Sequence, residues 1–252
     1  MQSFVHDGFE LAFIDEGHGD PILLIHGFAS THFVNWVATG WVKSLREAGY
    51  RVIALDNRGH GQSAGSYEEA DYTPVKMAGD AAALLDHLGI GRAHVLGYSM
   101  GARVSAFLAL EHPEKVATLI LGGLGIGMIE GVGEWDEIAA ALLAADPETI
   151  TSPRGQMFRK FADQTKSDRQ ALAACIATSR ELLSNEQAAR ITAPTLVAVG
   201  TRDDIAGSPE ALAALLPNAT AFAIERRDHM LAVGDRTFKA RALAFLEEHP
   251  LG

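Results

Sequence analysis

The chain has 252 residues, of which 48% are hydrophobic and 21% are charged, and its formal net charge at pH 7 is −11. This composition is typical of a globular protein and argues against long disordered regions. No basic cluster offsets the acidic excess, which disfavours nucleic acid and anionic membrane surfaces as partners, and a neutral substrate is easier to accommodate than a polyanion.

The only cysteine of the chain, Cys175, has no partner for an internal disulfide, which fits a reducing compartment. The amino-terminal residues lack the basic and then apolar pattern of a signal peptide. The longest apolar run, residues 117–129, is too short and too rich in glycine to cross a bilayer. We therefore expect a cytoplasmic protein with no membrane partner, and the sequence leaves its oligomeric state open.

Two short runs that alternate polar and apolar residues, 3–6 and 10–15, are joined by Asp7-Gly8 and predict an antiparallel hairpin at the edge of a sheet. The chain then alternates apolar runs, typical of buried strands, with runs typical of helices. The predicted strands are 22–25, 51–55, 93–96 and 116–121, and the predicted helices between them are 36–48, 74–88 and 102–110.

The alternation stops over residues 123–192. Residues 123–128 are rich in glycine and predict a flexible start, and four short helices are predicted at 134–145, 154–163, 169–180 and 185–190. Strands and helices then alternate again, at 195–199, 209–216, 220–224 and 236–248.

This order predicts an α/β fold, a mostly parallel twisted sheet with helices on both faces and ligands at the carboxyl ends of the strands. We expect a single domain whose core is residues 1–122 and 193–252, with residues 123–192 inserted as a small helical lid.

A serine lies between two glycines, Gly97 and Gly101, where the strand 93–96 meets the helix 102–110. In such a tight turn Ser99 would have a strained backbone and would project its hydroxyl past the edge of the sheet, as a nucleophile does. The alternative interpretation is an ordinary helix start with Ser99 near the N-cap position.

A serine hydroxyl needs a general base, and the base needs a carboxylate to fix its tautomer and stabilise its cation. His229 lies between the last strand and the last helix, and Asp203 and Asp204 follow the strand 195–199. The chain order serine, acid, histidine therefore predicts a catalytic triad at the carboxyl edge of the sheet.

Four motifs follow one another along the chain: His26-Gly27-Phe28, Asp56-x-Arg58-Gly59-x-Gly61-x-Ser63, Gly97-x-Ser99-x-Gly101, and Gly200-x-x-Asp203 followed by His229. In this order they resemble the α/β-hydrolase superfamily, in the branch of serine esterases and cofactor-free haloperoxidases, over essentially the whole chain. The resemblance implies that the acid stands three residues after a glycine, which selects Asp203 over Asp204. It also implies an oxyanion hole made by the main-chain N–H groups of Phe28 and Met100.

The substrate pocket is predicted to include Leu124, Met128, Trp135 and Met230, although for Met128 and Trp135 an ordinary place in the lid core is an equal alternative. His26 and His60 are predicted to be hydrogen-bonded scaffold, and Arg58 to pair internally.

The chain departs from common family patterns at two positions. Ala29 stands where relatives often have proline, which predicts a less rigid turn after Phe28. Asp228 stands where glycine often precedes the histidine, and it is expected either to act on His229 or to pair with a neighbouring arginine.

A serine nucleophile argues against relatives that use aspartate, such as dehalogenases and epoxide hydrolases. We expect hydrolysis of carboxylic esters with small acyl groups, or of polyester chain ends, by Ser99, His229 and Asp203 through an acyl-enzyme. Enol-lactonase, C–C bond hydrolase and perhydrolase activities use the same triad, and a slow-turnover ligand receptor is the alternative of another class. The sequence has no pattern for a metal or nucleotide cofactor, so no cofactor is predicted.

Overall fold

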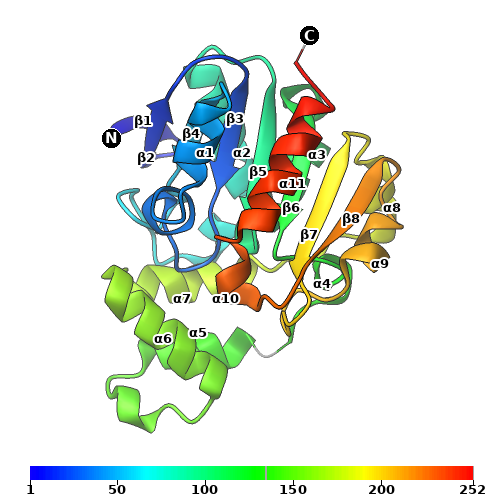
Figure 1. The fold of residues 1–252 in the computed structure, drawn as a ribbon. Coiled ribbons are helices and arrows are strands. Elements are labelled where there is room, and N and C mark those ends of the chain that lie inside the picture. The colour runs from blue at the N-terminus through cyan, green and yellow to red at the C-terminus, as the bar shows by residue number, and fades with distance from the viewer. Residues whose placement is uncertain (134, 252) are drawn as a thin grey trace.

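The apolar runs of the sequence form the strands of one twisted sheet in the computed structural model, which describes residues 1–133 and 135–251 (Figure 1). The strands are β1 (Gln2–His6), β2 (Phe9–Glu16), β3 (Pro21–Ile25), β4 (Arg51–Leu55), β5 (Ala93–Tyr98), β6 (Val116–Gly122), β7 (Thr195–Gly200) and β8 (Ala219–Ile224). Their order in the sheet is β1-β2-β4-β3-β5-β6-β7-β8. The pairs β1–β2 and β2–β4 are antiparallel, and all other neighbours are parallel.

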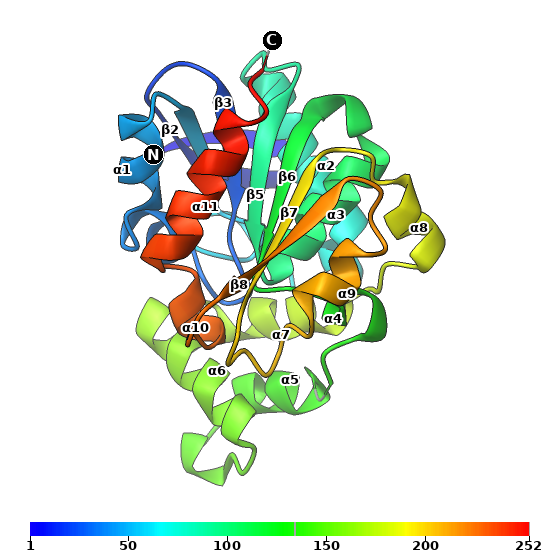
Figure 2. The same cartoon turned by 45° about the vertical axis from the view of Figure 1, so that its right-hand side comes forward.

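Helices cover both faces of the sheet, as Figure 2 shows. One face is covered by α1 (Trp41–Glu47) and α11 (Arg236–Glu247). The other is covered by α2 (Pro74–His87), α3 (Met100–Glu111) and α9 (Pro209–Ala213). The predicted α/β fold is therefore confirmed.

β3 shows why the central strands are apolar at nearly every position. Ile22 and Leu24 belong to the core beneath α1 and α11, whereas Leu23 and Ile25 belong to the core beneath α2 and α3. All four side chains are fully buried. Because successive side chains on a strand point to opposite faces, a strand that is covered on both sides has no position that favours a polar residue.

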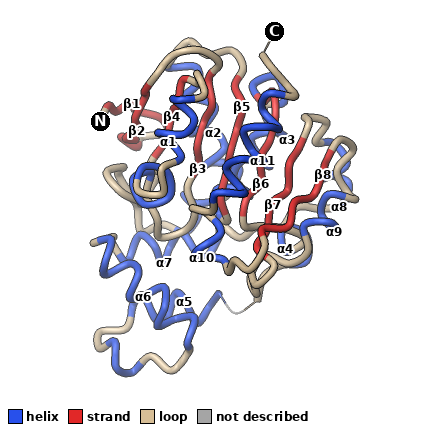
Figure 3. The backbone as a smooth tube through the Cα atoms, in the orientation of Figure 1, coloured by secondary structure: helices blue, strands red, loops and turns tan. Residues whose placement is uncertain are grey.

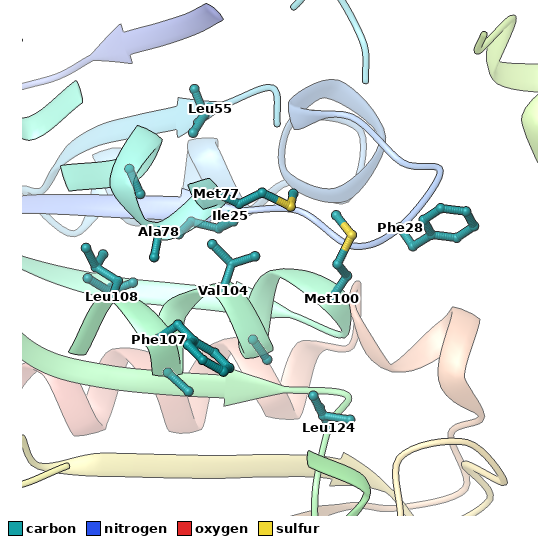
Figure 4. Packing of buried hydrophobic residues seen from close by; sticks show 14 of the residues in the cluster. Ile25, Phe28, Leu55, Met77, Ala78, Met100, Val104, Phe107, Leu108 and Leu124 are labelled. Atoms are coloured by element: carbon teal, nitrogen blue, oxygen red, sulfur yellow. The ribbon is translucent and has the colours of Figure 1, made fainter. Parts of the chain in front are cut away.

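α3 is held in place by the apolar core that it shares with β3 and α2. Figure 4 shows Val104 and Leu108 of α3 facing Ile25, Met77 and Ala78. Complete burial of one aliphatic side chain of this size contributes about 1.5–3 kcal/mol. The position of α3, and with it the residue that precedes α3, is therefore fixed by packing.

Between β6 and β7 the chain forms a group of helices, residues 123–192, that we call the inserted segment. Its helices are α4 (Gly127–Glu130), α5 (Trp135–Leu143), α6 (Pro153–Thr165), α7 (Arg169–Thr178) and α8 (Asn185–Arg190). α5 packs on both α6 and α7, and all three lie beyond the ends of the strands, near α10 (His229–Ala232) (Figures 1 and 2). Glu134, predicted as the first residue of a helix, lies outside the described residues, as does Gly252.

Single helical turns complete the fold, and Figure 3 separates the helices and strands from the loops that join them. The single helical turns are a π-helical turn, Phe33–Val37, and the 3₁₀ turns Glu69–Tyr72, Pro113–Lys115 and Pro147–Thr149. In the part of the chain that the structure describes, no helix combines the length and the apolar character needed to cross a membrane.

The predicted helix over residues 36–48 is confirmed only from Trp41 to Glu47, and its predicted start is wrong. A π-helical turn comes first, in which the N–H of Ala38 donates to the carbonyl oxygen of Phe33 at 2.8 Å, and α1 begins only at Trp41. Gly40, with φ of 82°, separates the two. Glycine adopts this left-handed backbone at little cost, and the apolar spacing continues across it, so periodicity alone could not reveal the break.

The prediction that residues 123–128 are flexible is wrong, because main-chain hydrogen bonds hold this run against the loop that follows β7. The N–H groups of Gly125 and Ile126 donate to the carbonyl oxygens of Ala206 and Ser208, both at 2.9 Å. A Cβ on Gly125 would lie 2.5 Å from the carbonyl oxygen of Gly207. These glycines therefore permit close packing of two backbones.

We expect Gly101→Ala to lower the free energy of unfolding by about 1–3 kcal/mol, or to prevent folding, because overpacking a dense core is costly. A Cβ on Gly101 would overlap the carbonyl oxygens of Ile25 and His26. Gly91→Ala is the matched control, because a Cβ there has nothing within 4 Å. Urea unfolding measures both variants, and equal stability of the two would contradict the close approach of α3 to β3.

Candidate active site

Ser99 is the one residue between β5 and α3, in the sharp turn that the sequence predicts. Its backbone has φ of 55° and ψ of −115°, a strained combination for a residue with a Cβ. Its N–H donates to the carbonyl oxygen of Gly122 at 2.8 Å. Its own carbonyl oxygen accepts from the N–H groups of Ala102 at 2.9 Å and Arg103 at 3.2 Å, so hydrogen bonds on both sides hold the turn.

The structure brings three predicted site residues into one hydrogen-bonded line. The hydroxyl of Ser99 donates to Nε2 of His229 at 3.0 Å, and the Nδ1–H of His229 donates to Oδ2 of Asp203 at 2.8 Å. The side chain of His229 is 9% exposed, and that of Asp203 is fully buried. In this tautomer Nε2 has a lone pair directed at the Ser99 proton, as a general base requires.

Main-chain donors distinguish Asp203 from Asp204. The other carboxylate oxygen of Asp203, Oδ1, accepts from the N–H groups of Ile205 at 2.9 Å and Ala206 at 3.0 Å. These bonds compensate for the burial of the charge and orient the carboxylate toward the imidazole. Asp204 is exposed.

Asp228 is the N-cap of α10 and forms no ion pair with an arginine among the described residues, so the expected pairing is wrong; its effect on His229 stays a prediction. Its Oδ1 accepts from the N–H groups of Met230 at 3.1 Å and Leu231 at 2.8 Å, which is the geometry of a helix N-cap. Arg227 pairs with Asp235 at 2.6 Å. Capping needs an acceptor at the first turn of α10, and an aspartate there supplies it.

Two main-chain N–H groups are implied as an oxyanion hole for Ser99, those of Phe28 and Met100. Phe28 and Met100 both line the cavity beside Ser99, and no acceptor for either N–H is found in the described part of the chain. The residue before Phe28 is held from behind, because the N–H of Gly27 donates to Oδ1 of Asn35 at 2.8 Å. Two N–H groups without acceptors next to a nucleophile are suited to bind negative charge.

Ala29 has a left-handed backbone, with φ of 56°, and is fully buried. Proline, whose ring fixes φ near about −65°, cannot adopt this conformation. The N–H of Ser30 closes the turn by donating to the carbonyl oxygen of Gly27 at 3.2 Å. Proline is therefore excluded at position 29 by this backbone conformation. The lower rigidity of the turn stays a prediction.

Buried polar residues behind this turn are hydrogen-bonded scaffold, as predicted. Nε2 of His26 accepts from the N–H of Asn57 at 3.0 Å, and Arg58 donates through Nε and Nη2 to both carboxylate oxygens of Asp80 at 2.7 Å. Burial lowers the pKa of His60 to about 3, so its ring is neutral at neutral pH. Within the described residues, no group of three or more His, Cys, Asp and Glu side chains is arranged to hold a metal ion.

A cavity of about 280 Å³ opens onto Ser99. Of the predicted pocket residues, Leu124, Trp135 and Met230 line it. Met128 does not, so the pocket prediction for it is wrong and the alternative, a place in the core, is confirmed: α4 turns its side chain into the core, where it is fully buried. The remaining walls come from the π-helical turn, from α3 and from the inserted segment.

Two polar residues that line the cavity, Asn35 and Arg103, were missed by the sequence analysis. Asn35 lies in the π-helical turn, whose hydrogen bonding leaves no periodic signal in the sequence. Arg103 had a signal, since it is the one charged residue between Ser99 and Leu110 in a helix that is otherwise apolar. Tyr98 was also missed, and its hydroxyl donates to the carbonyl oxygen of His229 at 2.6 Å.

Comparison with known proteins gives a consistent family. Residues 20–156 match the family model described as alpha/beta hydrolase fold. The dihydrolipoyllysine-residue acetyltransferase component of the acetoin cleaving system of Pseudomonas putida is 31% identical over 92% of this chain and 64% of that protein. The chain thus spans less than two thirds of the length of the first curated relatives that it matches.

Two solved structures resemble the whole chain. A hydrolase from Pseudomonas aeruginosa PA01 has a TM-score of 0.81 and 28% identity, and the match covers 97% of each chain. A thermophilic esterase from Thermogutta terrifontis has a TM-score of 0.75 and 26% identity, and the match covers 99% of this chain and 100% of that one.

We expect Asp203→Asn to slow the covalent labelling of Ser99 by an organophosphonate about 10³–10⁴-fold, because an amide does not hold the imidazole in the required tautomer. Asp204→Asn is the matched control and should keep the rate within about twofold, because Asp204 is exposed. Mass spectrometry of the labelled peptide measures both rates. A slow Asp204→Asn and a fast Asp203→Asn would reverse the assignment of the acid.

Proposed function

Because the chain belongs to the alpha/beta hydrolase family, we propose that it hydrolyses carboxylic esters through an acyl-enzyme on Ser99. One observation carries this proposal: the unbroken line of hydrogen bonds from Ser99 through His229 to Asp203, at 3.0 and 2.8 Å. A serine hydroxyl alone is too weakly acidic to attack an ester at neutral pH, and this line supplies the missing base.

In the first half of the proposed reaction, Oγ of Ser99 attacks the ester carbonyl carbon while Nε2 of His229 accepts the hydroxyl proton. Asp203 stabilises the imidazolium that forms. The negative carbonyl oxygen is bound by the N–H groups of Phe28 and Met100, and donors of this kind are each worth about 10²–10³ in rate. The bond to the alcohol oxygen then breaks, and the alcohol leaves with the proton from His229.

In the second half, water attacks the acyl carbon and gives its proton to Nε2 of His229. The bond between the acyl carbon and Oγ breaks, the acid is released, and the proton returns to Ser99. Apart from the substrate and one water molecule, this cycle uses only the three side chains and the two main-chain N–H groups.

The dimensions of the cavity favour small acyl groups. Its volume of about 280 Å³ lies just below the range for small-molecule sites, which is about 300–1,000 Å³. Apolar side chains of the inserted segment, Trp135, Phe158, Phe161 and Ile176, line it opposite Ser99. These walls accept the methylene groups of a short chain and limit the length that fits.

We expect p-nitrophenyl esters with short acyl chains to be turned over, with kcat/KM falling as the chain lengthens. Ser99→Ala should lower the rate by about 10³-fold or more, because the nucleophile is lost. Ser3→Ala on the exposed edge strand β1 is the matched control and should match the parent protein. A single slow turnover with tight retention of the product would instead favour a ligand receptor.

We expect the rate to fall as the pH is lowered, because a protonated imidazole of His229 cannot accept the Ser99 proton. Initial rates with one short ester, measured across the pH range in which the protein stays folded by circular dichroism, check this. A rate that stays constant down to about pH 4 contradicts an imidazole base.

A further inference from the structure

Arg103 places a buried guanidinium in the wall of the catalytic cavity. It lies on α3 four residues after Ser99, which is one helical turn, or a rise of about 6 Å. The residue is 3% exposed and lines the same cavity as Ser99. Although burial lowers the pKa of Arg103 to about 10, the group is a cation at neutral pH.

Three main-chain carbonyl oxygens accept hydrogen bonds from this guanidinium. Nη1 donates to Met128 at 3.0 Å and to Glu181 at 2.7 Å, and Nη2 donates to Gly127 at 3.3 Å. A guanidinium has five N–H donors. Nε–H and the second N–H of Nη2 therefore have no acceptor among the residues that the structure describes, and no carboxylate pairs with Arg103 there.

The Arg103 donors without an acceptor, on Nε and Nη2, are the same donors with which other arginines of this chain bind carboxylates. Nε and Nη2 form one edge of the planar group, and Arg51 uses that edge on both oxygens of Asp15, at 2.9 and 2.7 Å. Arg58 uses the same edge on Asp80. This paired arrangement is the strong, geometrically specific form of the arginine–carboxylate bond. In Arg103 the equivalent edge has donors available and no acid.

The cavity also has the charge that an anion requires. Besides His229 and Tyr98, the titratable side chains that line it within residues 1–133 and 135–251 are Arg103 and Arg180, and no carboxylate side chain lines it. Arg180 is already paired with Asp136 at 2.7 Å. The charge of Glu181 acts on Arg103 from outside the cavity lining, without forming an ion pair among the described residues. A buried charge with no carboxylate in contact is costly, so the charge of Arg103 favours binding of an anion in this cavity.

We propose that the substrate is a monoester of a short dicarboxylic acid, whose second carboxylate binds the Nε–Nη2 edge of Arg103 while Ser99 attacks the ester carbonyl. This rests on the proposed ester hydrolysis. The offset of one helical turn between the two residues suits acyl chains such as succinyl, glutaryl and adipyl. The free carboxylate is unchanged by the reaction, which adds one water across the ester bond and releases the dicarboxylate and the alcohol.

The test compares monomethyl glutarate with dimethyl glutarate, which differ chiefly in the charge at the far end. Methanol release, followed by NMR, gives kcat/KM for each. We expect the parent protein to prefer the monoester by about 10-fold or more, and Arg103→Gln to reduce that preference by about 10–100-fold, because a charge-assisted pair is lost. Using the ratio of two substrates in one variant cancels any general loss of activity.

Arg46→Gln is the matched control, because its guanidinium is exposed, paired with Glu16 at 2.8 Å and outside the residues that line the cavity; its preference should stay within about threefold of the parent. An equal or reversed preference in the parent protein, or an unchanged preference in Arg103→Gln, overturns the proposal. A preference lost only in Arg180→Gln would assign the site to the other arginine and overturn it as well.

Arg103 also ties α3 to the inserted segment through its three carbonyl partners, so Arg103→Gln is open to failure in folding. Calorimetry on Ser99→Ala, which keeps Arg103, then decides the question: glutarate should bind at least about 10-fold more tightly than butyrate. Equal affinities overturn the carboxylate site. If no ester is turned over, ester hydrolysis fails as a function, while the glutarate measurement still tests Arg103 by itself.

Discussion

The turn at Ser99 is the constraint on which the rest of the site depends. Its φ of 55° and ψ of −115° are avoided by residues with a Cβ, and the conformation persists because the surrounding packing leaves no alternative. α3 can approach β3 only because Gly101 has no side chain, and the hydroxyl of Ser105 binds the carbonyl oxygen of Gly101 at 2.7 Å. Packing of the apolar core thus holds the hydroxyl group of Ser99 in a fixed position.

The topology of the sheet supplies the partners of that hydroxyl. β5, β6, β7 and β8 are parallel neighbours, so the loops that follow them all leave from one edge. Asp203 follows β7 and His229 follows β8, while Ser99 follows β5. Residues that are separated by 130 positions in the chain therefore meet within hydrogen-bonding distance. Local hydrogen bonds from Ile205 and Ala206 then orient the buried carboxylate.

The sequence predicted most of this because the relevant signals are local: buried strands are apolar runs, and the residues at their ends are chemically distinctive. It failed where the outcome depends on contacts between distant segments. Met128 and Leu124 are both apolar residues of one short run, and only the packing of α4 decides which faces the cavity. The break at Gly40 is hidden for a similar reason, because glycine is compatible with either a helix or its end.

The net charge of the chain also did not predict the sign of the charge in the cavity. A total of −11 describes the whole surface, whereas the cavity wall carries two arginines, Arg103 and Arg180, in the part of the chain that the structure describes. Position, and not total charge, determines the field inside a water-poor cavity.

In the proposed reaction Ser99 carries the acyl group between the two half-reactions. Mass spectrometry of the intact protein, quenched in acid within milliseconds of mixing with a short ester and followed by peptide mapping, tests this step. We expect a mass increase equal to one acyl group, located on the peptide that contains Ser99 and lost as the reaction proceeds. An acyl group on another residue, or hydrolysis with no acylated protein under conditions in which release of the acid is the slow step, would contradict it.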